Sequence, residues 1–143
     1  MDQVILAQKL ESLRRCIQRV EEKTPLDVEV LIRDPDIQDI LVLNLTRAVQ
    51  LCVDIGSHII SESDEAVPTT MGDVFSSLMA LGAIQSATSE ALKKAVGFRN
   101  VAVHNYDVIN WEIVFAICEK SVDDFRGFAK EITDYSQSGK PGT

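Results

Sequence analysis

Apolar residues recur along this chain at alternating steps of three and four positions, which places them on one stripe of an amphipathic helix. Four long segments carry such a stripe, and two shorter apolar segments predict short helices. No segment shows the regular alternation of apolar and polar residues that predicts a strand. The four stripes span about residues 6–23, 37–59, 86–101 and 108–132, and the two short segments lie around 25–32 and 71–81.

The third long stripe differs from the others because it consists mainly of small residues. Ala87, Ala91 and Ala95 precede Phe98 at helical spacing. We expect these four residues to form the inner face of that helix, where small side chains permit a close approach of a neighbouring helix.

Residues that start and stop helices mark the ends of these segments. A side chain that caps a helix, followed by proline at the first helical position, is a start signal, and glycine is a stop signal. A polar, acidic stretch over 61–70 predicts a loop. The signals are Thr24-Pro25 and Asp34-Pro35 as starts, Thr70 as the cap of a short helix, Gly82 as its stop, and Asp107 as the cap of one last long helix.

Amphipathic stripes are buried by packing against one another, so the pattern predicts an all-α protein. We expect an antiparallel up-and-down four-helix bundle with two short extra helices. A chain of 143 residues fits one domain with its own core. We assign residues 1–135 to a single helical-bundle domain and expect the polar tail 136–143 to be disordered.

Composition and charge limit the classes of function. With 45% hydrophobic and 25% charged residues, the chain has the composition of a soluble protein, and we expect it in the cytoplasm because no apolar run approaches a membrane span. The net charge of −8 argues against a broad surface for nucleic acid. The absence of a C-x-x-C pair or a histidine cluster argues against zinc. We expect no metal site and no cofactor. Three cysteines lie among apolar residues and predict buried, reduced thiols: Cys16, Cys52 and Cys118.

The segment 93–111 holds most of the candidate chemistry. Arg99, Asn100, His104 and Tyr106 follow one another within eight positions. A guanidinium binds phosphate oxygens through its planar fork, and an imidazole moves protons near neutral pH. This combination therefore favours chemistry on a phosphate, although an arginine and a histidine near a helix end also occur for purely structural reasons.

Helix geometry restricts how this pattern can work. Residues five positions apart on a helix point about 140° apart, so Arg99 and His104 do not meet on one face. Either the helix ends or bends between them, or the site is built from two chains, which predicts a symmetric dimer. Gly97, just before the arginine, would fit a close approach by a partner backbone.

The pattern Arg-Asn-x-x-x-His-x-Tyr, late in a small helical chain and followed by a long helix, resembles the HEPN superfamily and, within it, the HepT-like toxin ribonucleases. The resemblance extends over nearly the whole chain and implies a metal-independent endoribonuclease that acts as a homodimer. It implies that Arg99 holds the scissile phosphate, that His104 transfers protons, and that Asn100 orients one of them. It also implies a partner, an MNT-type nucleotidyltransferase antitoxin, that adds AMP to Tyr106.

Other residues have weaker claims to a role. Lys93, Lys94 and Arg99 form a small basic patch. We consider the two lysines RNA-contact candidates, although adjacent lysines are often just a solvated helix face. His58 could line the cleft, but a histidine bonded to Asp54 one turn away is the simpler interpretation. The alternative function is a non-catalytic helical dimer that binds a nucleotide or accompanies a nucleotidyltransferase.

Overall fold

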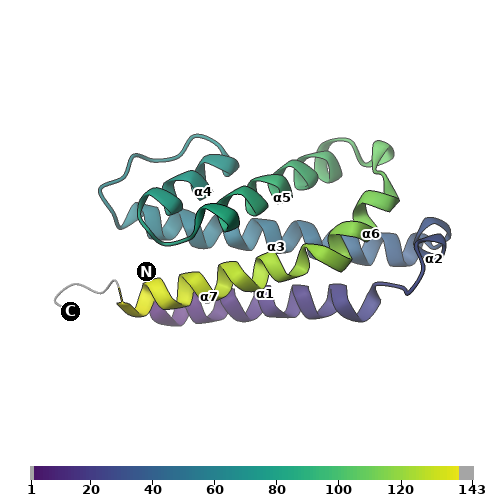
Figure 1. The fold of residues 1–143 in the computed structure, drawn as a ribbon, viewed down its shortest axis with the longest axis horizontal. Coiled ribbons are helices and arrows are strands. Elements are labelled where there is room, and N and C mark those ends of the chain that lie inside the picture. The colour runs from purple at the N-terminus through teal and green to yellow at the C-terminus, as the bar shows by residue number, and fades with distance from the viewer. Residues whose placement is uncertain (1, 139–143) are drawn as a thin grey trace.

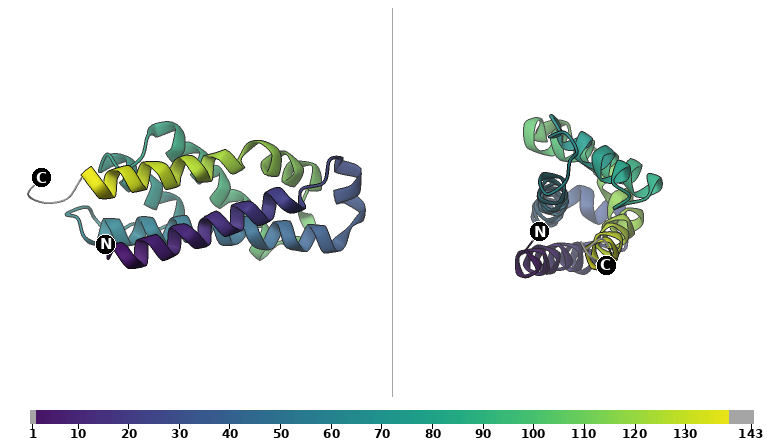
Figure 2. Two further views of the ribbon diagram at one scale, coloured as in Figure 1. Left: turned by 90° about the horizontal axis from the view of Figure 1, so that it is seen from below. Right: turned by 90° about the vertical axis from the view of Figure 1, so that its left-hand side faces the viewer.

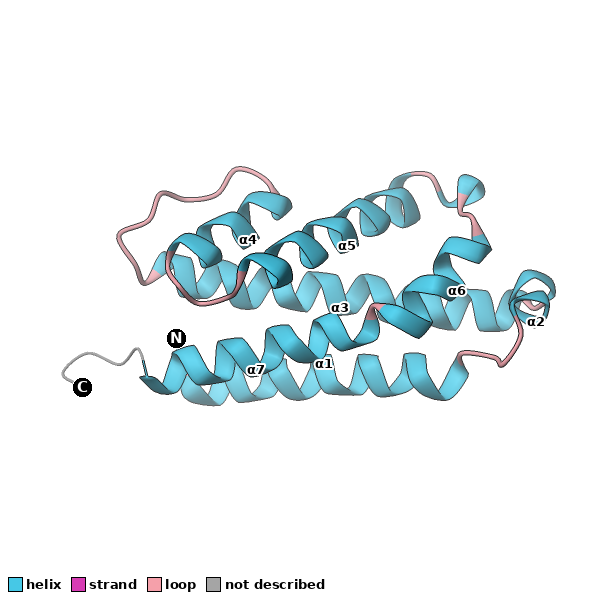
Figure 3. Cartoon of the chain, viewed as in Figure 1, coloured by secondary structure: helices cyan, strands magenta, loops and turns pink. Residues whose placement is uncertain are grey.

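The structure is a computed structural model that describes residues 2–138. Within this range the chain forms helices and loops and contains no strand (Figure 3). The helices are α1 (Gln3–Lys23), α2 (Val28–Arg33), α3 (Pro35–Ser61), α4 (Met71–Ala80), α5 (Ser86–His104), α6 (Trp111–Lys120) and α7 (Val122–Ser138), with a 3-10 turn η1 (Tyr106–Val108) between α5 and α6 (Figure 1).

The predicted all-α bundle is confirmed, with α1, α3, α5 and α7 as its long members. α3 is the central helix, because it contacts all six other α-helices. α1 and α7 lie on one side of α3, and α4 and α5 lie on another side (Figures 1 and 2). The buried apolar side chains form one core cluster among these helices.

The start of α3 follows from its local sequence as predicted. The Asp34 carboxylate accepts hydrogen bonds from the backbone N–H groups of Asp36 (3.0 Å) and Ile37 (3.2 Å), and Pro35 occupies the first turn. These contacts satisfy donors that have no partner within the helix. A long helix that begins at a fixed point carries its later residues to defined positions in the bundle.

By length and composition alone, α3 is long and apolar enough to cross a bilayer. Half of its apolar stretch is buried inside the bundle. The central helix of a bundle meets the same criteria because it packs against neighbours on several sides. The expectation that no apolar run approaches the length of a span is therefore too strict, and core packing explains the apolar character of α3.

The start of α2 differs from the prediction. Thr24 ends α1 instead of starting α2, and its hydroxyl donates to the carbonyl oxygen of Val20 (2.7 Å). Asp27 caps α2 and accepts from the backbone N–H of Glu29 (3.0 Å). Thr24 and Asp27 are both common capping residues. Because α2 begins after Asp27, the chain can turn between α1 and α2.

The last stripe forms two helices, not the single helix predicted from Asp107. Asp107 lies in η1, and the side chain of Asn110 caps α6 by accepting from the N–H groups of Glu112 (2.9 Å) and Ile113 (3.3 Å). The chain turns at Ser121, so that α6 packs on α2 while α7 packs on α1 and α5. The apolar spacing runs through this turn, which is why periodicity did not reveal it.

Two glycines shape the connection from α3 through α4 to α5. Gly82 has a φ of 79°, a left-handed conformation that favours glycine, and it stops α4 as predicted. Gly56 lies where α3 and α4 approach, since a Cβ atom there would be 2.5 Å from Cγ1 of Val74. These positions fix how α4 rests on the central helix.

The three cysteines are buried and unpaired, as expected for reduced thiols. At the other end of the chain, α7 continues through Ser138, and the hydroxyl of Ser136 accepts a hydrogen bond from Gln3 (3.0 Å). The expectation of a disordered tail from residue 136 is therefore wrong for 136–138. Its remainder, 139–143, lies outside the described residues.

Candidate functional site

The second half of α5 and the turn after it carry the predicted functional residues. α5 is helical through His104 and ends at Asn105, whose backbone (φ −151°, ψ 57°) leaves the helical region. The expected end near Val101 was thus too early by about one turn. Arg99 is half-buried, His104 is exposed, and Tyr106 begins η1.

The two residues proposed for catalysis share one uninterrupted helix. They therefore point about 140° apart. No hydrogen bond or ring contact joins Arg99 to His104 in residues 2–138. Of the two arrangements left open by the sequence, a helix break between them is absent, so one chain alone does not bring both groups to one phosphate.

Arg99 lies on the face of α5 that is buried in the first half of the helix. Leu92 and Val96 face the core, with exposed fractions of 0% and 7%, and Arg99 and Val103 extend the same line toward the end of the helix. Val103 is 52% exposed. α4 has 10 residues against 19 in α5 and accompanies the first half of that helix (Figure 1). The second half of this face is therefore left open.

The predicted inner face of α5 proves to be a different one. The buried side chains of its first half are Ser89, Leu92 and Val96. The alanine stripe lies on the side turned toward α6 and α7, where Ala87 is exposed and the other members are partly buried. It lines an apolar groove together with Val101, Val108, Ile113 and Ile117. Small residues recur in the stripe at core spacing, and spacing alone did not separate a core face from a groove.

The charge of Arg99 is not neutralised within the described chain. Its Nη1 donates to Oδ1 of Asn100 at 3.5 Å, which is at the outer limit of a hydrogen bond, and no carboxylate pairs with it in residues 2–138. A half-buried guanidinium without a counter-charge is a favourable partner for an anion. The exposed imidazole of His104 stands at the end of the same helix.

Tyr106 is held from two sides. Its hydroxyl donates a hydrogen bond to Oδ1 of Asp39 on α3 (2.7 Å), and its ring meets Trp111 edge to face with centroids 6.0 Å apart. Burial, followed by the hydrogen bond and the charge of Asp39, raises the pKa of Tyr106 to about 12. The phenol therefore keeps its proton near neutral pH and remains 40% exposed.

Asp39 is the residue that the sequence did not reveal. It lies 67 positions before Tyr106. It occupies an exposed position near the start of a strongly apolar helix. An acidic residue at such a position is typical of an ordinary solvated surface. Only the packing of α5 and η1 against α3 brings the two together.

The two lysines do not form one patch. Lys93 falls on the side of α5 that also carries Asn100 and His104, but it pairs with Glu90 at 3.8 Å. Lys94 lines the apolar groove and lies near Asp124, whose pKa is raised mainly by burial and lowered in part by this lysine. The RNA-contact role therefore stays a prediction for both residues.

The suggested pairing of His58 with Asp54 is not found in residues 2–138. A carboxylate oxygen of Asp54 instead accepts from Nε2 of Gln50 (2.9 Å), and His58 is exposed. Over the same residues, no three histidine, cysteine, aspartate or glutamate side chains gather in a way that could hold a metal ion.

Comparison with known proteins gives consistent similarities along nearly the whole chain. A family model described as ribonuclease HepT-like matches residues 13–132. The chain is 34% identical over 124 residues to the mRNA nuclease HepT of Shewanella oneidensis, covering 87% of this chain and 92% of that protein. It is 24% identical over 136 residues to a putative RNase of Archaeoglobus fulgidus, covering 94% of this chain and 95% of that protein.

Solved structures show the same architecture. A tri-AMPylated HEPN toxin of Shewanella oneidensis in complex with an MNT antitoxin superimposes with a TM-score of 0.86 at 33% identity, covering 94% of this chain and 99% of that one. A toxin–antitoxin structure with AMP-PNP gives a TM-score of 0.84 at 32% identity, covering 92% and 99%.

Proposed function

The chain belongs to the HepT-like ribonuclease family, and on this premise we propose that it is the RNA-cleaving toxin of a toxin–antitoxin pair. The observation that carries the proposal is the end of α5, where Arg99 has no carboxylate partner in residues 2–138 and His104, on another side of the helix, is exposed. The partner is a nucleotidyltransferase antitoxin of the MNT type, and the toxin acts on RNA in the cytoplasm. Similarity to a toxin crystallised with such an antitoxin supports this pairing.

The proposed reaction uses the RNA itself as the nucleophile. The 2′-hydroxyl attacks the adjacent phosphorus, the bond from phosphorus to the 5′-oxygen breaks, and a 2′,3′-cyclic phosphate and a free 5′-hydroxyl result. His104 takes the proton from the 2′-hydroxyl or returns one to the leaving oxygen. Arg99 binds the phosphate oxygens and stabilises the negative charge that builds on them. Asn100 keeps the guanidinium oriented.

A second copy of the chain completes the site in this proposal. Because one helix points Arg99 and His104 about 140° apart, the arginine of one copy works with the histidine of the other across a two-fold axis. Val103, 52% exposed between these two residues on the helix surface, gives the partner an apolar contact. The open half of the α5 face is then covered by the partner and by RNA.

Modification of Tyr106 provides the control. The phenolic oxygen attacks the α-phosphorus of ATP, pyrophosphate leaves, and the phenolic proton is released. The added AMP places bulk and negative charge two residues from His104, which blocks RNA phosphate by occupation and repulsion. Because the hydroxyl now carries AMP, it no longer donates to Asp39, so the modified turn also loses this hydrogen bond to α3.

Growth and cleavage assays test the proposal together. Expression without the antitoxin should arrest growth, and Arg99→Ala or His104→Ala should relieve the arrest while circular dichroism and melting temperature stay close to those of the parent. Each variant should also lower RNA cleavage by at least about 100-fold, the usual contribution of a proton-transfer or charge-stabilising group.

The ends of the RNA products give an independent readout. Purified protein with EDTA present should yield 2′,3′-cyclic phosphate ends. Variants that remain as toxic as the parent would contradict the assignment. A purified protein that binds ATP or AMP tightly yet cuts no RNA would instead select the non-catalytic nucleotide-binding dimer.

A further inference from the structure

A second groove runs between α1 and α3 and collects an unusual share of the positive charge. Three of the seven arginines of the chain line it: Arg15 and Arg19 from α1 and Arg47 from α3. Asp54 is the one carboxylate among its lining residues. In a chain with a net charge of −8, this local concentration is not expected from composition. The remaining lining residues include the polar side chains Ser12, Asn44 and Gln50.

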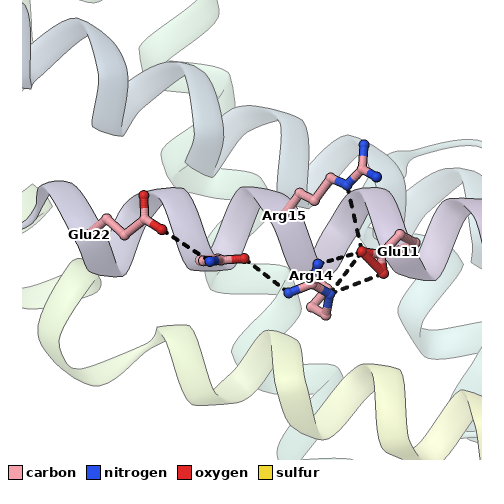
Figure 4. Close-up of polar contacts among 5 residues, drawn as sticks. Glu11, Arg14, Arg15 and Glu22 are labelled. Carbon is pink, nitrogen blue, oxygen red and sulfur yellow. Dashed lines mark hydrogen bonds and ion pairs between the residues drawn. The ribbon is translucent and has the colours of Figure 1, made fainter.

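These arginines are weakly paired within the molecule. Arg47 has no hydrogen bond or ion pair with any residue in 2–138, and Arg19 approaches Glu22 at 3.9 Å, near the limit of an ion pair. Arg15 approaches Glu11 at 3.6 Å, but that carboxylate is held from the other side by Arg14 (Figure 4). Exposed pairs of this kind are worth little energy, so a stronger anion can replace them.

Arg15 and Arg19 line the α1 side of the groove, and Arg47 lines its α3 side. Arg15 and Arg19 are four positions apart and share one face of α1, about 6 Å from each other at the backbone. Cys16 lies between them, and burial raises the pKa of its thiol while the charge of Arg47 works against that rise. Arg47 therefore reaches from α3 toward the same strip of α1. Two cations in line and one opposite match a chain of phosphates better than a single anion.

The groove between α1 and α3 begins close to Tyr106. Asp39, which binds the Tyr106 hydroxyl, lies one helical turn from Leu43, and Leu43 lines the groove. Arg47 follows one turn later, about 12 Å along α3 from Asp39. A single RNA strand that leaves the end of α5 near Tyr106 can therefore reach the groove within a few nucleotides.

We propose that the groove between α1 and α3 binds the phosphodiester backbone of single-stranded RNA flanking the cleaved bond, with Arg15, Arg19 and Arg47 each contacting a phosphate. This inference rests on the proposed nuclease function and identifies how an acidic protein holds its substrate. It assigns RNA affinity to a surface separate from Arg99 and His104.

Binding is measured first, in a His104→Ala background so that the RNA is not cut. The test protein carries Arg15→Gln, Arg19→Gln and Arg47→Gln. The control carries Arg14→Gln, Arg33→Gln and Arg126→Gln, which remove the same charge from other faces. With a labelled RNA of about 15 nucleotides, near the upper size of single-strand sites, the test variant should bind at least about tenfold more weakly. The slope of log affinity against log salt should fall by about two, since each phosphate contact contributes about 0.7.

Cleavage then separates the groove from the catalytic site. With His104 intact, the test variant should lose kcat/KM on the long RNA and keep it on a trinucleotide that fills the cleft alone. Equal RNA binding and equal long-RNA cleavage by test and control variants would overturn the groove and leave the nuclease assignment standing. Weaker RNA binding by the test variant alone would support the groove even if the parent cut no RNA. Loss of the antitoxin complex with unchanged RNA affinity would overturn the proposal and identify a protein-docking surface.

Discussion

At the scale of single residues, the contact between Tyr106 and Asp39 ties the turn after α5 to the central helix. The bond is short, 2.7 Å, and it joins residues 67 positions apart. The hydroxyl that we propose as the acceptor of AMP is thereby held at a fixed place on the surface. Together with burial, the same contact raises the pKa of Tyr106, and this pKa can be measured without an activity assay.

Removing the acid should lower the pKa of Tyr106. Asp39→Asn removes the negative charge, and Asp39→Ala also removes the hydrogen bond, so the pKa should fall from about 12 in that order. Burial, the largest cause of the rise, persists in both variants, so the pKa should stay above 10.0, its ordinary value. Tyrosinate absorbance in a Tyr135→Phe background, which leaves Tyr106 as the sole tyrosine, reports the titration. An unchanged pKa in both variants would show that the contact does not form in solution.

Tyr106 itself should carry the modification. Intact mass after incubation with the antitoxin and ATP should show one or more added AMP units on the parent and on Tyr135→Phe. Tyr106→Phe should gain none, because its ring lacks the attacking oxygen. That variant should also remain toxic beside the antitoxin if modification is the main control. Added mass on Tyr106→Phe would place the acceptor elsewhere.

The sequence could supply part of this residue-scale description. Arg99, Asn100, His104 and Tyr106 stand within eight positions, so a local pattern contains them. Packing between distant segments brings Asp39 to Tyr106. It also brings the arginines of α1 and α3 to one groove. Surface charges of this kind have no periodic or local signal, and only the fold shows that they meet.

At the scale of helices, apolar spacing predicted how many amphipathic segments the chain contains. It was less successful in predicting where the helices end and which of their faces are buried. The predicted capping residues were correct where a helix start had one candidate side chain, as at Asp34 and Thr70. They were wrong where two candidates competed, as at Asp107 and Asn110. The inner face of α5 was misassigned because alanine is accepted both in a core and along a groove, and only neighbouring helices decide between them.

Two glycine-to-alanine substitutions test the assigned helix contacts. Gly56→Ala should lower the free energy of unfolding by about 1–3 kcal/mol, because the new methyl group would overlap Val74 and Leu78. Gly97→Ala should raise it by about 0.5–1 kcal/mol, because its Cβ meets nothing within 4 Å and alanine favours helix. Urea unfolding of both variants gives the two values. A destabilised Gly97→Ala that also dissociates on dilution would show that a partner backbone packs against Gly97, as the sequence suggested.

At the scale of the whole molecule, charge and symmetry belong together. The chain is acidic overall, yet within residues 2–138 Arg99 on α5 has no carboxylate partner, and three weakly paired arginines gather between α1 and α3. General repulsion of RNA with local attraction would favour substrates that reach both places. Because one chain points its arginine and histidine apart, the catalytic unit of this account is a pair of chains.

The most direct test of the central claim is complementation between two inactive chains. An Arg99→Ala chain and a His104→Ala chain are expressed with different tags, and their heterodimer is purified and assayed for RNA cleavage. It contains one site with both groups supplied from opposite chains, so it should recover about half of the parent activity per dimer. The matched heterodimer of a parent chain with an Arg99→Ala/His104→Ala chain should be inactive, because neither site is complete. The reverse result, an inactive first heterodimer and an active second one, would contradict the account by showing that each chain works alone.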